Sequence, residues 1–345
     1  MARSLVLLLA FVLGGCLPVR YITQAAAGQD QLNSAGIEIA EIVEGEHLDK
    51  RTRELLAHVA RIKAFGERYG LKRTKNYERY IDIRRPAVVW VVSACHPLAF
   101  RPQVWKFPIV GSITYTGWFD KKEAQAYGAE LARRGWDVDV RPSPAYSTLG
   151  WFDDPILSTM ISSEEDALGE LADTVLHETL HATFYVPSQS TLNESVASFF
   201  GDELAAKYLD EAVGPDSVEK KAFLEHRARS AERGALMKQA YDELAKLYAD
   251  RKRPKEERLA EKKRIIAELK AKTKSRRAIN NASLIQMKTY GSGKPQLREL
   301  LQQCGGDYPR MLRTLDRLRA TSKTAPPHSD PGVLLQPLLA EGGCP

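Results

Sequence analysis

The chain has 345 residues, a net charge of +6 and an apolar fraction of 43%. This composition excludes a disordered chain, and the length fits one large domain or two smaller ones. No internal stretch approaches the roughly 20 apolar residues of a transmembrane helix, so a multi-span membrane protein is also excluded.

The first 16 residues, MARSLVLLLAFVLGGC, differ from the rest of the chain. One arginine, a short apolar run and small residues are typical of a cleaved export signal, and a buried N-terminal helix is the alternative. The LGGC ending resembles the lipobox of bacterial lipoproteins. That resemblance implies a signal peptide over residues 1–15, a lipidated Cys16 and a protein facing the periplasm. Leu17 implies sorting to the outer membrane.

Three cysteines remain if Cys16 carries lipid, namely Cys95, Cys304 and Cys344. They allow at most one disulfide with one cysteine left over, which excludes a disulfide-built scaffold. None of them has CxxC spacing, so a cysteine-based metal site is not expected.

In chain order, residues 16–50 are expected to be a tether, and the apolar spacing of residues 53–70 predicts a helix. A further helix is predicted from residue 121 to Gly135. The β-branched or alternating runs predict strands at residues 86–94, 105–119 (a strand or hairpin) and 136–142. This order predicts an α+β fold, mostly helical with a small sheet.

Residues 216–277 contain 20 lysines and arginines against 11 aspartates and glutamates. The helical pattern is broken once, near Pro254, which predicts a charged hairpin insertion of two long helices. Its interleaved glutamates favour a solvated insertion, and binding of anionic lipid or a protein partner through residues 216–277 is the alternative. An exported protein is not expected to bind nucleic acid.

The remaining chain returns to ordinary globular composition, with two helices expected within residues 278–322. Residues 51–215 and 278–322 are therefore expected to form the main domain. The proline- and glycine-rich residues 323–345 are expected to be a flexible tail.

A long helix is predicted after the capping signature of Ser162 and Glu165, and it contains the motif HETLH, which begins at His177. His177 and His181 are four residues apart, so they share one helix face and can both reach one Zn²⁺. Glu178 then lies beside the metal, where it can act as general base on water. Two solvent-facing histidines are the alternative.

A catalytic zinc needs a third protein ligand and an open fourth position, and the candidate carboxylates are Glu194, Asp202, Glu203 and Asp210. The distance along the chain from His181 favours Glu203, because it is nearer to that of well-known HExxH enzymes with a glutamate as third ligand. Glu194 also has a competing structural role, since Thr191 and Glu194 fit a helix capping box. The turn at Pro187 favours Glu194, because it places this residue in the first turn of a returning helix. Glu194 is the predicted ligand.

The segment LHETLHATFYVPSQSTLNESVASFFGDE, with PAYSTLGWFDDPILSTM and the LGGC start, closely resembles a family of bacterial lipoproteins that are predicted zinc aminopeptidases. YITQAAAGQ, WKFPIVGSITYTGWFD and NNASLIQMKTY are similar as well. Asn193-Glu194 followed by Ala197 is similar to the NExxA signature of gluzincin peptidases. The resemblance implies a zincin-like fold and a peptidase with His177, His181 and Glu194 as zinc ligands and Glu178 as base.

Peptide hydrolysis also needs a donor for the oxyanion, and the candidate is Tyr146, with Tyr115 and Tyr185 as alternatives. Asp153 and Asp154 are candidates for binding the free amine of a substrate. The alternative is that FDDP, residues 152–155, forms a turn before Pro155.

The GxMEN segment of familiar aminopeptidases is absent, which weakens an exopeptidase assignment. Asp173, one turn before His177, either orients this ligand or faces solvent. The sequence predicts a lipid-anchored zinc peptidase, most simply an aminopeptidase. The alternatives are an endopeptidase acting on envelope proteins and a non-catalytic lipoprotein that docks partners through the hairpin.

Overall fold

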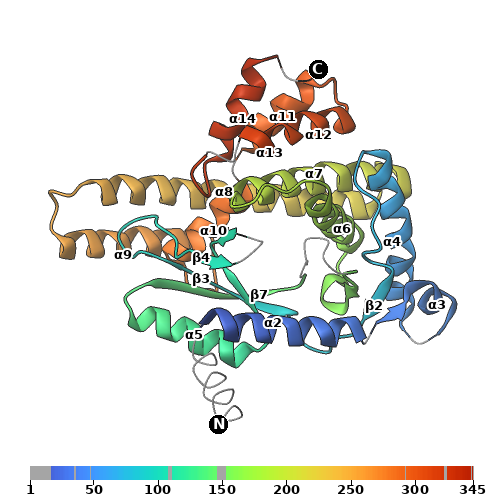
Figure 1. The fold of residues 1–345 in the computed structure, drawn as a ribbon, viewed down its shortest axis with the longest axis horizontal. Helices are drawn as coiled ribbons and strands as arrows, with labels where there is room; N and C mark the ends of the chain where they lie inside the picture. Colours follow the sequence, from blue (N-terminus) through green and yellow to red (C-terminus); the bar gives the residue numbers. More distant parts are fainter. Residues whose placement is uncertain are drawn as a thin grey trace, which may run out of the picture.

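The computed structural model describes residues 17–34, 36–46, 48–107, 111–145, 153–291, 293–321, 325–342 and 344. Cys16, Tyr146 and residues 1–15 therefore lie outside the described part. Within it, helices dominate and the strands form small sheets (Figure 1). None of its helices is both long enough and apolar enough to cross a bilayer.

The central sheet has three antiparallel strands, with β3 (Val89–Cys95) between β6 (Thr116–Trp118) and β7 (Asp137–Ser143). Helices α5 (Lys121–Arg133) and α10 (Asn281–Gly291) both pack against β3 and β7. They lie on opposite sides of the sheet (Figure 1). The strands expected at residues 86–94 and 136–142 correspond to β3 and β7.

Every residue of β3 is buried, because both faces of the strand are covered. Trp90, Val92 and Ala94 belong to a cluster with α5, whereas Val89 and Val91 face the main core. A strand buried on both faces reads as a continuous apolar run rather than an alternating one.

The remaining strands are short. Strand β2 (Arg79–Ile81) pairs antiparallel with β1 (Ile37–Glu38) and parallel with β8 (Ile156–Leu157). Strands β4 (Trp105–Phe107) and β5 (Gly111–Ile113) form a two-stranded antiparallel pair. Residues 105–119, expected as one strand or a hairpin, therefore contribute β4 and β5 to one sheet and β6 to the central sheet.

The main core lies among helices, chiefly α4 (Lys50–Arg68), α6 (Ala167–Thr183) and α7 (Ser190–Ala212). Two short helical segments, α3 (Ile39–Glu44) and η1 (Ser158–Met160), contact α4 and α6 respectively. Helices α6 and α7 have the most extensive contact of any pair in the described chain. This close pair carries the predicted metal ligands.

Helix α6 begins later than the capping signature predicts. Asp166 is at the N-cap position, and the hydroxyl of Ser162 accepts a hydrogen bond from the N–H of Glu164 at 3.1 Å. Ser162 therefore stabilises a turn before the helix instead of its first turn.

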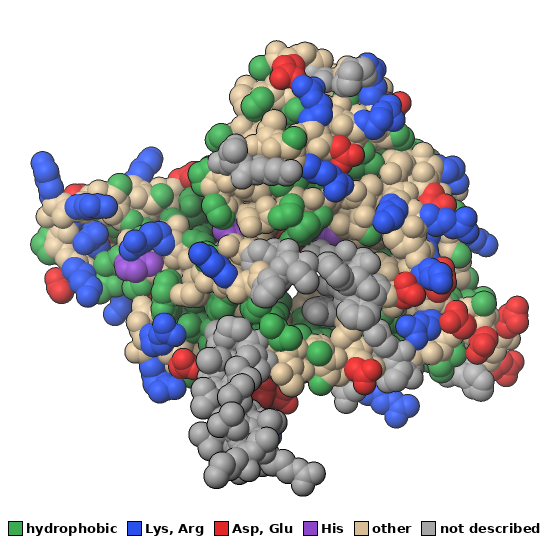
Figure 2. Space-filling view, viewed as in Figure 1, with side chains coloured by type: hydrophobic (Ala, Val, Ile, Leu, Met, Phe, Trp, Pro, Cys, Tyr) green, Lys and Arg blue, Asp and Glu red, His purple; other side chains and the backbone are tan. Residues whose placement is uncertain are grey.

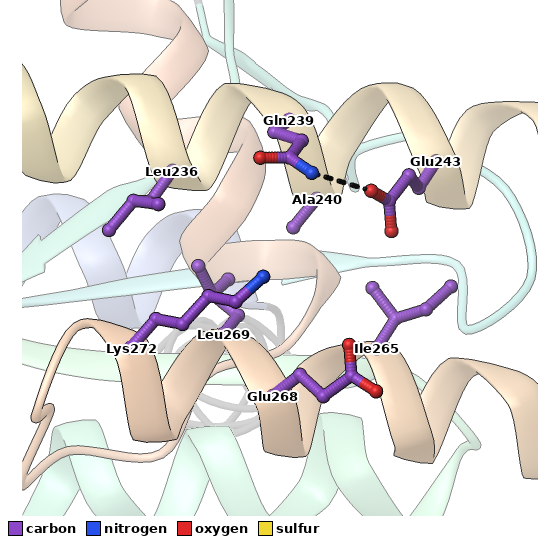
Figure 3. Close-up of a pocket in the computed structure, with 8 residues that line it drawn as sticks. All are labelled: Leu236, Gln239, Ala240, Glu243, Ile265, Glu268, Leu269 and Lys272. Atoms are coloured by element: carbon purple, nitrogen blue, oxygen red, sulfur yellow. Dashed lines mark hydrogen bonds between the residues drawn. The ribbon is translucent and has the colours of Figure 1, made fainter.

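The expected hairpin is formed by α8 (Val218–Ala249) and α9 (Lys255–Lys272). Leu236 and Ala240 of α8 face Ile265 and Leu269 of α9 (Figure 3). The cavity between them has a volume of about 20 Å³, which is room for about one water molecule. The hairpin interior is thus a packed seam and not a ligand site.

Exposed basic side chains gather at the far end of the hairpin, on the left of Figure 2. They surround the turn between α8 and α9, and they are Arg251, Lys252, Arg253 and Lys255. Glu256 and Glu257 are exposed beside them, so the end of the hairpin carries charges of both signs.

The hairpin also packs on the rest of the fold, through side chains along α8 and α9. The ammonium of Lys262 donates to the carbonyl of Pro97 at 2.9 Å and pairs with Asp137. Phe100 stacks on Tyr241 with 3.8 Å between ring centroids. These contacts join the hairpin to β7 and to the segment that follows β3.

The expected tether over residues 16–50 is instead built into the fold, as helix α2 (Leu17–Ser34) with β1 and α3. The side chain of Gln24 accepts a hydrogen bond from the N–H of Phe119 at 3.0 Å. A Cβ at Gly28 would lie 2.3 Å from the ring of Phe119, so the glycine permits close packing. The polar Gln24 and the small Gly28 therefore pack α2 against Phe119, and composition alone does not predict this contact.

The chain after the hairpin forms more helices than the two expected within residues 278–322. Glycines with positive φ, Gly293, Gly305 and Gly306, interrupt the helical pattern. After α10, the resulting helices are α11 (Lys294–Gln303), α12 (Tyr308–Asp316) and α13 (Leu318–Thr321).

Residues 323–345, expected as a flexible tail, contain a packed helix, α14 (Pro331–Ala340). Leu335 is fully buried, and a disulfide joins Cys344 to Cys304. Leucines at positions i, i+3 and i+4 give this segment an apolar face, which outweighs its proline-rich composition.

Candidate metal centre

Three side chains from α6 and α7 converge at one point. The Oε2 atom of Glu194 lies 3.4 Å from Nε2 of His177 and 3.7 Å from Nε2 of His181. The two imidazole rings are nearly perpendicular, with centroids 5.0 Å apart. This is the arrangement that the HETLH spacing and Glu194 predict.

These separations suit a tetrahedral metal ion. Ligand atoms about 2.0–2.1 Å from a tetrahedral zinc lie about 3.4 Å from one another. The three atoms of His177, His181 and Glu194 can therefore share one ion with small adjustments. No fourth histidine, cysteine or carboxylate of the described residues joins this group.

The electrostatics of the cluster favour a cation. Burial lowers the pKa of His177, but its hydrogen bond with Glu194 and the charge of Glu178 outweigh burial and raise this pKa to about 9. Burial by itself raises the pKa of Glu194, yet His181 and His177 hold it far below its usual range. The buried carboxylate thus requires a positive charge beside it, either protons or a metal ion.

The loop between α6 and α7 sets the position of Glu194. The side chain of Asn193 accepts from the N–H of Val186 and donates to its carbonyl, both at 2.8 Å. Helix α7 begins at Ser190 with Gln189 at the N-cap position. The carboxylate of Glu194 lies at the histidines, so the capping box with Thr191 is not formed.

The other candidate ligands are engaged elsewhere. Glu203 pairs with Arg298 at 2.7 Å, and Asp210 pairs with Lys220 at 2.6 Å. Asp202 pairs with an arginine and a lysine. The described structure therefore brings only Glu194 to the two histidines.

Glu178 is half-buried and lies near a tyrosine that the sequence does not point out. The hydroxyl of Tyr77 is fully buried and has no hydrogen-bond partner among the described residues. Burial raises the pKa of Tyr77 well above its usual value, and the charges of Glu178 and Asp154 add to this. Tyr77 is a candidate donor at the site, and nothing in its local sequence marks it.

Of the predicted tyrosines, Tyr146 lies outside the described residues. The hydroxyl of Tyr115 donates to Oε1 of Glu194 at 3.3 Å, so it restrains the carboxylate of the predicted third ligand. Burial raises the pKa of Tyr185, and the charge of Glu194 adds to this.

The two aspartates predicted to bind an amine lie in different surroundings. Asp153 is exposed, whereas Asp154 is 2% exposed. The backbone of Asp154 accepts from the N–H of Tyr77 at 2.6 Å and donates to the side chain of Asn76 at 3.2 Å. Asp154 is thus held next to Tyr77.

A second cluster of possible ligands lies two turns earlier on α6. Nδ1 of His226 is 2.7 Å from Oδ2 of Asp166 and 3.5 Å from Oε1 of Glu170. The guanidinium of Arg227 lies 3.0 Å from the same oxygen of Glu170. An arginine therefore already supplies the positive charge that these carboxylates require.

A family model described as "Putative aminopeptidase" matches residues 20–327. The match spans α2, the central sheet, the metal cluster and the hairpin. No curated protein and no solved structure matches the chain.

Proposed function

The chain belongs to the aminopeptidase family whose model spans residues 20–327, and we propose that it is a zinc-dependent peptidase with a zincin-like, gluzincin-type site. The observation that carries this proposal is the convergence of His177, His181 and Glu194 at separations that suit one tetrahedral ion. We assign these residues as the zinc ligands and Glu178 as the general base.

Zinc bound by these ligands supplies Lewis-acid activation of water and of the scissile carbonyl. Glu178 follows His177 directly on α6, so its carboxylate lies beside the metal position and accepts the proton of the attacking water. The same carboxyl group then returns the proton to the leaving amine. Tyr77 and Tyr185 line this neighbourhood and are candidate donors to the oxyanion.

The open fourth position separates a catalytic from a structural zinc. Structural zinc sites are closed by four protein ligands, whereas catalytic sites retain a place for water. Three ligands are present among the described residues. This supports a catalytic ion over the alternative of a non-catalytic lipoprotein with the hairpin as a docking surface.

Aminopeptidase activity requires a group that binds the substrate's free amine. We propose that Asp154 does this, because it is buried beside Tyr77 near Glu178, whereas Asp153 is exposed. Cleavage of free peptides, but not of N-acetylated ones, is the expected result. Cleavage inside N-acetylated peptides would instead favour the endopeptidase alternative.

We further propose that the protein is exported and anchored through a lipid on Cys16, facing the periplasm. The Cys304–Cys344 disulfide supports export, since disulfides persist in oxidising compartments. Labelling with a radioactive fatty acid should modify the wild type and not Cys16→Ser, and labelling of both would contradict this assignment.

The function is tested by metal analysis and a peptide-library cleavage assay on the wild type and Glu178→Gln. Stoichiometric zinc with cleavage only by the wild type is expected. Bound zinc without cleavage of any peptide would refute the enzyme. The third ligand is tested by comparing Glu194→Ala with Glu203→Ala: loss of zinc in the second variant alone would overturn the assignment of Glu194.

A further inference from the structure

Arg227 of α8, the first helix of the hairpin, reaches both helices that carry the proposed metal ligands. Its guanidinium lies 2.8 Å from Asp173 and 3.0 Å from Glu170, both on α6, and 3.1 Å from Asp202 on α7. Arg227 therefore bridges the two helices that supply the metal ligands.

One of these carboxylates lies directly beside a metal ligand. Asp173 is one helical turn before His177, and its charge contributes to the raised pKa of this histidine. A Cβ at Gly201 of α7 would lie 2.4 Å from Oδ1 of Asp173 and 3.3 Å from the Cβ of His177. Asp173 and His177 thus occupy the same small space against α7, which only a glycine at this position leaves open.

The two oxygens of Asp173 have different surroundings. Oδ2 is bound by Arg227, whereas Oδ1 is buried without a hydrogen-bond partner among the described residues. A carboxylate beside a ligating histidine can accept the N–H of the ring nitrogen that does not bind the metal, which fixes the ring's orientation. Arg227 restrains Asp173 in the place where this contact can form.

Asp202 extends the same restraint to the helix of the third ligand. It lies eight residues after Glu194 on α7, about two helical turns away. Its second oxygen pairs with Lys294 of α11. Arg227 is held in turn by Phe223, whose buried ring lies 4.6 Å below the guanidinium and packs against Gly169 of α6.

We propose that Arg227 is a positioning residue of the metal site, which makes the base of the hairpin part of the catalytic centre. It fixes Asp173 beside His177 and ties α6 to α7 through Asp202. This inference rests on the proposed function, since it assigns a role toward zinc bound by His177, His181 and Glu194.

The test compares zinc affinity of the full chain carrying Arg227→Met, Arg227→Lys or Asp173→Asn, measured by competition with a chromogenic chelator. Loss of a group that orients a metal ligand typically weakens metal binding by about 10- to 100-fold. We expect this loss in Arg227→Met and Asp173→Asn. Arg227→Lys should recover part of it, because lysine carries the charge without the planar fork.

Two controls separate positioning from general destabilisation. Arg229→Met removes an exposed arginine that pairs with Glu225 of the same helix, and it should leave zinc affinity within about twofold. Leu244→Ala truncates a fully buried leucine of the hairpin, so it should lower Tm without weakening zinc binding at a temperature where the protein is folded.

Binding of Co²⁺ gives a readout that a purely structural role would not change. The visible absorption of the Co²⁺ protein reports ligand geometry, and it should shift in Arg227→Met and stay as in the wild type in Leu244→Ala. If Arg227→Met does not fold, Asp173→Asn and Arg227→Lys decide. Wild-type zinc affinity in these folded variants would overturn the inference, whereas a wild type that binds no zinc would overturn the proposed function.

Discussion

Helix α6 contributes to two clusters of histidine and carboxylate groups, and the clusters differ in the source of their positive charge. At His177, His181 and Glu194, no lysine or arginine reaches the carboxylate in any ion pair of the described residues. At Asp166, Glu170 and His226, Arg227 lies 3.0 Å from Glu170.

Burial separates the two clusters as well. The side chains of His181 and Glu194 are 5% and 11% exposed, whereas those of His226 and Glu170 are 40% and 31% exposed. A buried carboxylate needs a compensating charge far more than an exposed one. Residue types alone therefore do not define a metal site, since the second cluster has similar types and is already neutralised.

The largest expected effect distinguishes two half-buried glutamates of α6. Glu178→Gln should slow peptide cleavage by roughly 10²- to 10⁴-fold, the usual contribution of a general base, without loss of zinc. Glu170→Gln removes one of three carboxylates at Arg227 and leaves Asp173 and Asp202 in place, so it should leave the rate within about twofold. Steady-state kinetics with parallel metal analysis measure both, and equal rates for the two variants would remove Glu178 from the mechanism.

Replacing one histidine in each cluster should sharpen the contrast further. Zinc binds protein sites with about 10–16 kcal/mol spread over its ligands, so losing one ligand costs roughly 3 kcal/mol, or more than 100-fold in affinity. His181→Ala should show this loss in a chelator competition, whereas His226→Ala should bind zinc as the wild type does. The reverse pattern would place the metal at the second cluster.

The two clusters should also respond differently to pH. Zinc needs a neutral imidazole, and the metal-free His177 has its pKa raised to about 9, so apparent zinc affinity should rise up to tenfold per pH unit until about pH 9. Arg227 stays charged throughout this range. Isothermal titrations at several pH values test this, and a flat profile below pH 9 contradicts it.

The free energy of unfolding of the metal-free protein should also follow the titration of His177, but it should fall as pH rises, whereas zinc affinity rises. The folded pKa of His177 exceeds its unfolded value of about 6.5, so its contribution is complete below that pH and is lost as pH rises through about 9. Urea melts of the metal-free protein measure it. Glu194→Gln removes the partner and should flatten the slope.

The smallest effect concerns the contact that holds the third ligand. Tyr115→Phe removes the 3.3 Å hydrogen bond to Glu194, worth about 1 kcal/mol, so zinc affinity should fall roughly fivefold. Tyr185→Phe forms the matched control, because no hydrogen bond joins Tyr185 to Glu194 in the described structure. Equal affinities in both variants would show that Tyr115 does not restrain the ligand.

Patterns that depend on short spacing could be predicted from the sequence. The apolar run of β3 marks a buried strand, and the spacing of HETLH places two imidazoles on one helix face, because the helix repeat alone sets their distance. The resemblance to an aminopeptidase family is confirmed by the family match over residues 20–327.

Composition was a poor guide where packing decides. The residues expected as a tether form helix α2, whose Gln24 and Gly28 pack at the end of strand β6. The proline-rich tail forms helix α14, and a disulfide between Cys304 and Cys344 fixes the segment after it. Composition does not report whether a neighbouring surface is available to cover a segment.

The sequence by itself determined that two histidines and the glutamate between them lie on one helix, since this depends on contacts within about one turn. Only the tertiary structure decided the rest of the site. It selected Glu194 over Glu203, placed Tyr77 and Tyr115 near the ligands, and brought Arg227 to Asp173 from 54 residues away. Such long-range contacts depend on how the helices pack, which no local pattern encodes.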